Sequence, residues 1–227
     1  IRLAIEHIDA GEAELTDVRS LQSGSVYIAA SEVALRCLLL PVLKQFRLLY
    51  PGIHLRISNH STPQAIDALK NGTADFAVVT TPTLPVSSLT EIPVKPIGET
   101  AICTPYFSEL VGKPVSLSQL TQFPLISLGK DTRSFAFYSA FFAAHGVRYE
   151  PDIEAFTADQ ILPMVQADLG IGFVPEDFLR EGDGICRIQL TEPIPERHIV
   201  LIKRKEQPLS MAAKALEQRI LQPAATV

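Results

Sequence analysis

The sequence predicts an α/β protein built from two similar Rossmann-like lobes, and three observations lead to this fold class. Residues 26–79 alternate apolar runs with helical patterns in the order strand, helix, strand, helix, strand. Residues 125–174 repeat that order, with about 50 residues in each copy. The chain also passes between the copies twice, at residues 89–104 and 199–202. Two crossover strands between two lobes predict a hinge and a cleft.

Local signals define the elements of the first copy. Pro51-Gly52 stops the long apolar helix, because proline cannot continue the hydrogen bonding of a helix. We expect Thr62 to cap the next helix, with Pro63 in its first turn and Asn71-Gly72 at its end. The predicted elements are strand 26–30, helix 33–50, strand 53–58, helix 62–70 and strand 76–79. This order predicts a parallel sheet with right-handed crossovers.

The second copy follows the same signals. Thr157 is expected to cap a helix as Thr62 does, and Gly170 to end it as Gly72 does. The further predicted elements are extended segments 89–104, 125–128, 147–156, 171–174, 185–190 and 199–202, and helices 105–110, 116–120, 135–144, 157–168 and 211–221. We therefore divide the chain into lobe I, residues 24–101 with 200–222, and lobe II, residues 102–199.

Residues 1–21 form one more predicted helix, with a narrow apolar stripe and acidic residues on its other faces. Gly11 weakens it by about 1 kcal/mol relative to alanine. A helix this polar is marginal alone. It packs either on a partner chain or on its own domain, and the pattern favours neither.

Composition limits the class of protein. The 227 residues are 47% hydrophobic, which fits a globular core, and a net charge of −5 argues against a nucleic-acid surface. Cys37, Cys103 and Cys186 are odd in number and far apart, which fits a reducing compartment without a disulfide framework. No segment resembles a membrane span or a signal peptide. Because the chain starts with Ile1, we expect a fragment or a processed product.

The common motifs of catalysis and metal binding are missing from the sequence. The five histidines lack the spacing of metal ligands. No G-x-S-x-G, P-loop or dinucleotide-binding motif occurs. We therefore expect no catalytic residues, no metal and no cofactor. An enzyme on this scaffold remains an alternative that turnover of a bound metabolite would support.

Hydroxyl side chains gather at the predicted carboxyl ends of the strands, where ligands of parallel sheets bind. Helices that begin near Ser31, Thr62, Arg133 and Thr157 would direct free N–H groups into the cleft. Such helix starts suit a carboxylate or a similar anion. The plain alternative is that these hydroxyls only cap helices, and the sequence alone favours it.

Five stretches together resemble one known family. They are residues 24–31 (GSVYIAAS), 40–46 (LPVLKQF), 50–55 (YPGIHL), 69–78 (LKNGTADFAV) and 165–175 (VQADLGIGFVP). The combination resembles the effector-binding half of a LysR-type transcriptional regulator and covers nearly the whole chain. The resemblance implies a periplasmic-binding-protein-like (type II) fold, a cytoplasmic regulator, and a small effector whose binding shifts a hinge near residues 99–104 and 199–202.

The resemblance also implies partners. The family's N-terminal winged helix-turn-helix is absent, so DNA would be bound only through that domain, and residues 1–23 resemble the end of the linker helix before it. A homodimer is implied through helices 35–50 and 135–144, with a tetramer when full length and no membrane contact. We expect the second helix to leave a wide aromatic surface, formed by Phe135, Phe137, Phe141 and Phe142; core packing is the alternative.

The expected effector site combines both arguments. Lys130 and Arg133 would add positive charge for an anionic effector, although solvent exposure explains them equally well. Ile102 and Phe173 would form apolar walls. No cysteine pair resembles the thiol switch of some family members, so none is expected. The full set is Ser31, Ser61, Thr62, Thr80, Thr81, Ile102, Ser127, Lys130, Arg133, Thr157 and Phe173. A solute-binding protein of a transport system would share the fold, but the linker-like helix argues against it.

Overall fold

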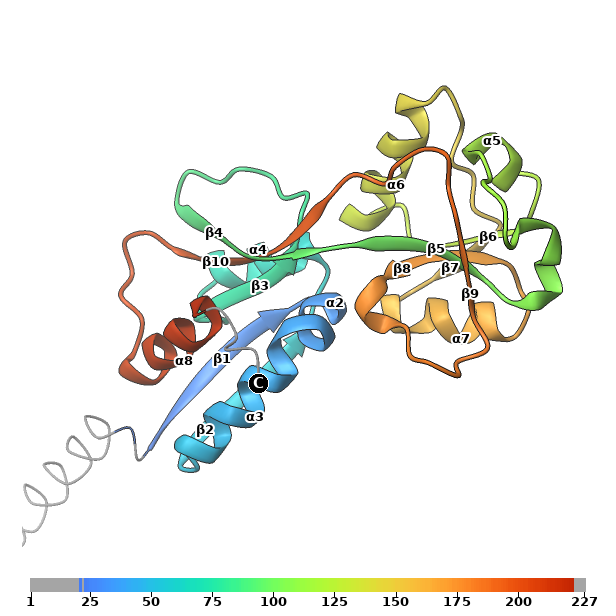
Figure 1. The fold of residues 1–227 in the computed structure, drawn as a ribbon. Coiled ribbons are helices and arrows are strands. Elements are labelled where there is room, and N and C mark those ends of the chain that lie inside the picture. Colours follow the sequence, from blue (N-terminus) through green and yellow to red (C-terminus); the bar gives the residue numbers. More distant parts are fainter. Residues whose placement is uncertain (1–20, 22, 223–227) are drawn as a thin grey trace, which may run out of the picture.

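The computed structural model describes residue 21 and residues 23–222, which form two α/β lobes that lie side by side (Figure 1). Each lobe contains a five-stranded sheet. Lobe I holds β1 (Gly24–Ala30), β2 (Ile53–Asn59), β3 (Phe76–Thr80), β4 (Leu89–Ile97) and β10 (Arg197–Arg204). Lobe II holds β5 (Glu99–Cys103), β6 (Leu125–Leu128), β7 (Ile153–Ala155), β8 (Ile171–Pro175) and β9 (Cys186–Ile188). The predicted two-lobed α/β fold is confirmed. The predicted helix 1–21 lies outside the described residues, apart from Leu21.

Both sheets follow the same pairing pattern, with orders β2-β1-β3-β10-β4 and β7-β6-β8-β5-β9. In lobe I, β1 pairs in parallel with β2 and β3, and β10 lies antiparallel between β3 and β4. In lobe II, β6 pairs in parallel with β7 and β8, and β5 lies antiparallel between β8 and β9. β10 and β5 thus hold equivalent places, and each begins where the chain enters its lobe from the other one (Figure 1).

The predicted helix 33–50 is a continuous helical run in three parts: α2 (Glu32–Ala34), the π-helical segment η1 (Leu35–Leu39) and α3 (Leu40–Leu49). Pro41 lacks the N–H that would donate to the Cys37 carbonyl, four residues earlier. The Nζ of Lys95 donates to that carbonyl instead, at 3.2 Å. The other helices are α4 (Thr62–Lys70), η2 (Pro105–Leu110), α5 (Leu117–Leu120), α6 (Arg133–Ala144), η3 (Ala158–Gln160), α7 (Ile161–Gln166), η4 (Glu176–Phe178) and α8 (Met211–Leu221).

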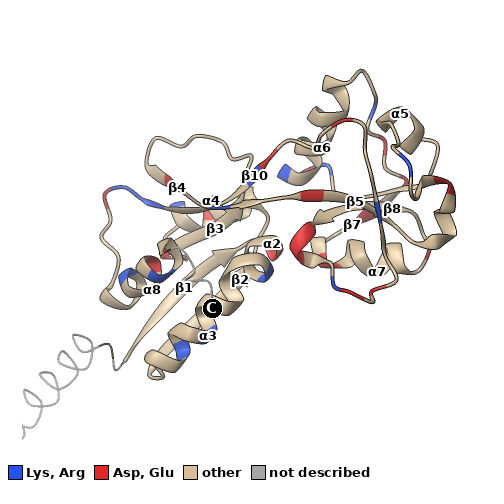
Figure 2. Ribbon diagram, viewed as in Figure 1, with Lys and Arg blue, Asp and Glu red and all other residues tan. Residues whose placement is uncertain are grey.

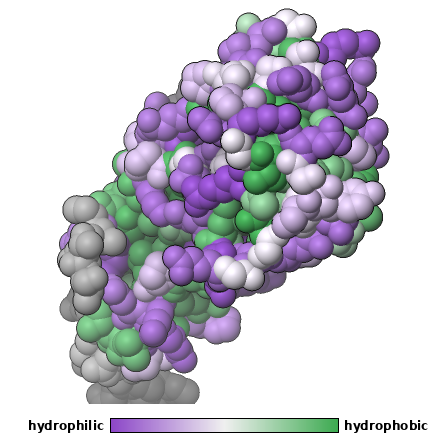
Figure 3. Space-filling model, turned by 45° about the vertical axis from the view of Figure 1, so that its right-hand side comes forward, coloured by the Kyte–Doolittle hydropathy of each residue, from purple (hydrophilic) through white to green (hydrophobic). Residues whose placement is uncertain are grey.

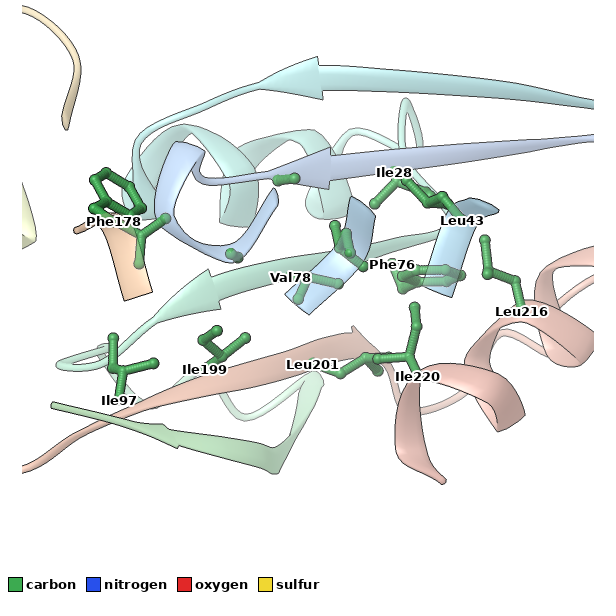
Figure 4. Packing of buried hydrophobic residues seen from close by; sticks show 14 of the residues in the cluster. Ile28, Leu43, Phe76, Val78, Ile97, Phe178, Ile199, Leu201, Leu216 and Ile220 are labelled. Carbon is green, nitrogen blue, oxygen red and sulfur yellow. The ribbon is translucent and has the colours of Figure 1, made fainter. Parts of the chain in front are cut away.

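Apolar side chains from the sheet and the helices fill lobe I. Phe76 on β3 lies between Leu43 of α3 and Leu216 of α8 (Figure 4). The same buried cluster includes Phe178 of lobe II, and the guanidinium of Arg36 lies 3.9 Å from the centre of the Phe178 ring. The lobes therefore touch beside the cleft as well as joining through the two crossing strands.

The aromatic residues of α6 pack mainly within lobe II. Phe141 and Phe142 are buried, so the expected exposed aromatic surface is wrong for them, and Phe135 and Phe137 are half-buried. The physical reason is that the lobe II sheet and the coil before β7 bring further rings, Tyr149 and Phe173 among them, against this helix. Exposed apolar side chains occur instead on α3, at Leu40, Leu48 and Leu49.

Three local predictions need correction. Ser61, not Thr62, is the N-cap of α4, and its N–H donates to Gln64 Oε1 at 2.9 Å. The helix before β8 ends with Asp168 in the left-handed region (φ 59°), and not with Gly170. The predicted extended segment 147–156 pairs as a strand only at Ile153–Ala155, because Tyr149 turns into the core before it.

The change from one sheet to the other falls at Gly98 on the outward crossing and just before Arg197 on the return. Both points lie a few residues before the predicted lobe limits, 101/102 and 199/200, which stay a prediction as domain boundaries. In the part of the chain that the structure describes, no helix is long and apolar enough to cross a membrane.

Candidate functional site

A cavity of about 470 Å³ lies between the lobes, at the carboxyl ends of β1, β2, β3, β6 and β7. Its walls come from residues 31–33, 59–62, 64 and 80 of lobe I and from residues 128, 129, 131–134 and 154–158 of lobe II. In the space-filling view, hydrophobic surface is recessed between hydrophilic residues near the middle of the face shown (Figure 3). The position is the one that parallel sheets offer to ligands.

Four helical segments begin at this cavity, and hydroxyl residues cap them. Ser31 Oγ accepts from the Ala34 N–H at 3.2 Å, and Thr132 Oγ1 accepts from the Phe135 N–H at 3.1 Å. Ser61 and Thr157 hold the N-cap positions of α4 and η3. The capping interpretation is therefore correct for these residues. It does not remove them from the site, because a capped helix start still presents backbone N–H groups and a positive dipole end to the cavity.

The predicted site residues fall into three groups. Those that line the cavity are Ser31, Ser61, Thr62, Thr80, Arg133 and Thr157. Ser127 and Phe173 line a narrow space of about 20 Å³ that shares Val33 and Ser134 with the cavity. Thr81, Ile102 and Lys130 line neither space. Ile102 is fully buried in the core, Thr81 Oγ1 accepts from the His198 N–H at 2.9 Å, and Lys130 is exposed.

The charge of the cavity differs from the expected positive one. Glu32, Asp131 and Glu154 line it together with one guanidinium, that of Arg133. Charged residues of both signs lie on elements at the junction of the lobes (Figure 2). Partial burial raises the pKa of Glu32, and the nearby charge of Asp159 raises it further. Sequence reasoning missed these carboxylates, because an acidic residue at a helix start, in a turn or on a strand gives no sign that it lines a cavity.

The narrow space beside the cavity is lined by a buried ion pair that sequence reasoning also missed. Arg197 Nη1 lies 2.7 Å from Glu99 Oε1, and the two side chains are 2% and 1% exposed. The other guanidinium nitrogens donate to Thr81 O at 2.8 Å, Thr80 Oγ1 at 2.9 Å and Ser134 Oγ at 3.3 Å. Arg197 begins β10 and Glu99 begins β5, so one guanidinium ties both crossing strands and both lobes together. The available signal was a charged residue at the start of each crossing strand.

Two aromatic residues of α6 complete this network. The Tyr138 O–H donates to Glu99 Oε2 at 2.7 Å, and the Arg197 guanidinium lies 4.8 Å from the centre of the Phe137 ring. Burial raises the pKa of Tyr138 well above its ordinary value, and the charge of Glu99 raises it further. The phenol therefore stays protonated and donates to the carboxylate throughout the neutral range.

Tyr138→Phe should lower the free energy of unfolding by about 1–2 kcal/mol, because one oxygen of a buried carboxylate loses its donor. Tyr106→Phe is the control, since that side chain is 73% exposed and its change should stay within about 0.5 kcal/mol. Urea unfolding followed by circular dichroism measures both. Equal stability of the two variants would mean that the Tyr138–Glu99 hydrogen bond contributes nothing.

Comparisons with known proteins agree with the fold and place the chain in a family. The family model described as the LysR substrate binding domain matches residues 19–224. The transcriptional regulator CysB of Burkholderia cenocepacia is 27% identical over 160 residues, which are 70% of this chain and 51% of that protein. The chain spans about half the length of curated relatives that it matches.

Solved structures show the same fold. The regulatory domain of Synechocystis CcmR, solved in complex with 2-PG, has a TM-score of 0.79 at 16% identity, covering 88% of this chain and 96% of that one. The effector-binding domain of QuiR, solved in complex with shikimate, has a TM-score of 0.76 at 15% identity, with the same coverage. Because the family model matches nearly the whole of its length, the chain belongs to the family of LysR substrate-binding domains, the effector-binding domains of LysR-type transcriptional regulators.

Proposed function

We propose that this chain detects a small effector in the cavity between its lobes and passes the binding event to the DNA-binding part of a longer transcriptional regulator. One observation carries the proposal: the 470 Å³ cavity is walled by both lobes at the carboxyl ends of their strands, in a domain of the LysR family. Relatives named as transcriptional regulators, in which the matched segment covers about half of the protein, support it.

The lining favours an effector with one anionic end. Helix starts capped by Ser31, Ser61, Thr132 and Thr157 offer N–H groups and positive dipole ends. The carboxylates of Glu32, Asp131 and Glu154 repel an anion at their own positions and attract hydrogen-bond donors or a positive charge. We therefore expect a small carboxylate or similar anion that also carries donor groups. Shikimate, the ligand in the QuiR structure, is a hydroxylated carboxylate and illustrates the class.

A thermal-shift screen tests this proposal, since a ligand that binds only the native state raises its melting temperature. The screen pairs each small carboxylate with its uncharged amide. We expect a hit among hydroxylated or amino-substituted carboxylates, with no shift for the matching amide. An amide that shifts the melting temperature equally would reject the anionic end and leave effector binding intact. Absence of any hit from a broad metabolite set would count against the cavity as an effector site.

Ser31 offers a test within the site. Ser31→Ala should weaken a hit from the screen about tenfold, because its hydroxyl and the helix start behind it face the ligand space. The same change also removes a helix cap, so the matched control is Ser116→Ala, which loses the equivalent bond to the Gln119 N–H at 3.2 Å far from the cavity. Isothermal titration calorimetry should show weaker binding for the first variant only. Equal affinities would remove Ser31 from the site.

The signal would travel through the hinge. The crossing strands meet at Gly98 and Arg197, so an effector that contacts both lobes would favour one lobe angle over others. X-ray scattering with and without a hit from the screen measures this directly. We expect a smaller radius of gyration with ligand, and identical curves would contradict the hinge while leaving binding unaffected.

We also propose that two subunits pair through α3, because leucine side chains on this helix are exposed.

A further inference from the structure

Two of the three cysteines are direct neighbours in lobe II, although they are far apart in the sequence. Cys103 on β5 lies opposite Cys186 on β9 in the antiparallel register of these strands. Residues directly opposite in such a pair project to the same face of the sheet, with Cα atoms about 4.5 or 5.5 Å apart. A disulfide spans Cα atoms about 4.4–6.8 Å apart, so this pair needs little backbone movement to close one.

The surroundings of the two thiols agree with this register. Cys103 is fully buried in the apolar cluster of lobe II, and Cys186 packs against the same cluster while remaining half-buried. Burial raises the pKa of Cys103 to about 11, and the neighbouring Cys186 raises it as well. Cys37 belongs to η1 in lobe I, outside this cluster. All three cysteines are free thiols in the structure, so the pair has both electrons and protons to give up.

We propose that Cys103 and Cys186 are a thiol-modification site that closes to an intramolecular disulfide when the protein meets a small-molecule disulfide. The Cys186 thiolate, the more accessible of the two, attacks one sulfur of the small disulfide and releases the first small thiolate. The Cys103 thiolate then attacks Cys186 Sγ of the mixed disulfide and expels the second. Two cysteine thiols are oxidised and one small disulfide is reduced to two thiols, so atoms and electrons balance.

The closed disulfide would join the two crossover paths inside lobe II. β5 carries the chain into lobe II from Glu99, and β9 precedes the segment that returns to Arg197. A covalent link between these strands restricts the edge strand β9 and removes conformations from the unfolded chain. Oxidation should therefore raise the melting temperature of the chain by about 5–15 °C, reversibly. The odd number and wide spacing of the cysteines hid this pair, because the strand order, which sequence spacing does not report, brings them together.

The experiment treats the purified reduced chain with oxidised glutathione at pH 8, then blocks free thiols with N-ethylmaleimide for peptide mass spectrometry. We expect a cross-linked peptide pair containing Cys103 and Cys186, one maleimide on Cys37, and a melting temperature that falls back after dithiothreitol. Three maleimides with no adduct, a disulfide that includes Cys37, a glutathione adduct that persists on Cys186, or a cross-link without a rise in melting temperature would each overturn the proposal.

Single replacements separate the steps. Cys37→Ser should leave the cross-link unchanged, since that residue takes no part in it. Cys103→Ala should trap glutathione on Cys186, because the second thiol is missing, and alanine avoids burying a new hydroxyl. Cys186→Ser changes a half-buried side chain and should leave Cys103 without a glutathione adduct. Formation of any disulfide in Cys186→Ser, or a glutathione adduct on its buried Cys103, would contradict the order of events.

Discussion

Arg197→Met should lower the free energy of unfolding by about 3–5 kcal/mol. The replacement removes a guanidinium that is 2% exposed and leaves the Glu99 carboxylate, 1% exposed, without its positive partner. It also leaves the Thr81 carbonyl without the donor that lies 2.8 Å away. A buried charge without a partner keeps its full desolvation cost, which is why breaking such a pair costs far more than the pair contributes. Urea unfolding at pH 7 measures the loss.

An exposed ion pair provides the control for this variant. Arg187 lies 3.6 Å from Glu176, and these side chains are 56% and 49% exposed, so Arg187→Met should change stability by less than about 0.5 kcal/mol. Adding Glu99→Leu to Arg197→Met should recover part of the loss, because no charge then remains buried. If Arg197→Met lost no more stability than Arg187→Met, the network at the cleft would be only a surface contact.

Gly170→Ala should cost about 3 kcal/mol, the next largest effect that we expect. A Cβ at this position would lie 2.5 Å from the Pro124 carbonyl oxygen and 3.3 Å from Ile126 Cγ1. That carbonyl accepts the Ile171 N–H at 2.8 Å, beside the point where β8 begins to pair with β6. The backbone cannot move away without giving up this hydrogen bond, so the methyl group must displace a strand. Chemical denaturation of both this variant and the parent chain gives the difference.

Gly72→Ala tests a second reason for a glycine, a backbone conformation with positive φ, separately from close packing. Gly72 has a φ of 71° and nothing within 4 Å of an added Cβ, so alanine there should cost only about 1 kcal/mol of backbone strain. The sequence pattern predicted that each of these two glycines ends a helix. A Gly72→Ala loss equal to or larger than that of Gly170→Ala would mean that close packing against Pro124 is not what requires glycine at position 170.

Much of the fold followed from local patterns. The apolar periods and the turn residues predicted the order of strands and helices in both copies, and the C-terminal helix agrees at both ends, 211 and 221. The errors concern nearby residues that suit the same helix-capping position, and a sequence pattern does not distinguish between them. Ser61 and Thr62 are both good caps, and only the packing of Thr62 under β3, where its hydroxyl donates to Thr80 O at 3.4 Å, decides between them. Asp168, an uncommon left-handed residue, ends a helix that Gly170 appeared suited to end.

The candidate site was predictable in place but not in composition. Strand ends and helix starts sufficed to put Ser31, Thr80 and Thr157 at the cavity. They could not exclude Ile102, because a strand that borders a cleft and one that lies in the core share the same apolar pattern.

By itself, the sequence determined the class of fold, the duplication of its lobes, the family and the general location of the cavity, because these depend on periodicity and on residues adjacent in the chain. Only the tertiary structure decided that Arg197 and Glu99 form a buried pair, that three carboxylates line the cavity, and that Cys103 faces Cys186. These features join residues from distant segments. Their energies depend on burial and separation, and both quantities exist only after the strands have paired.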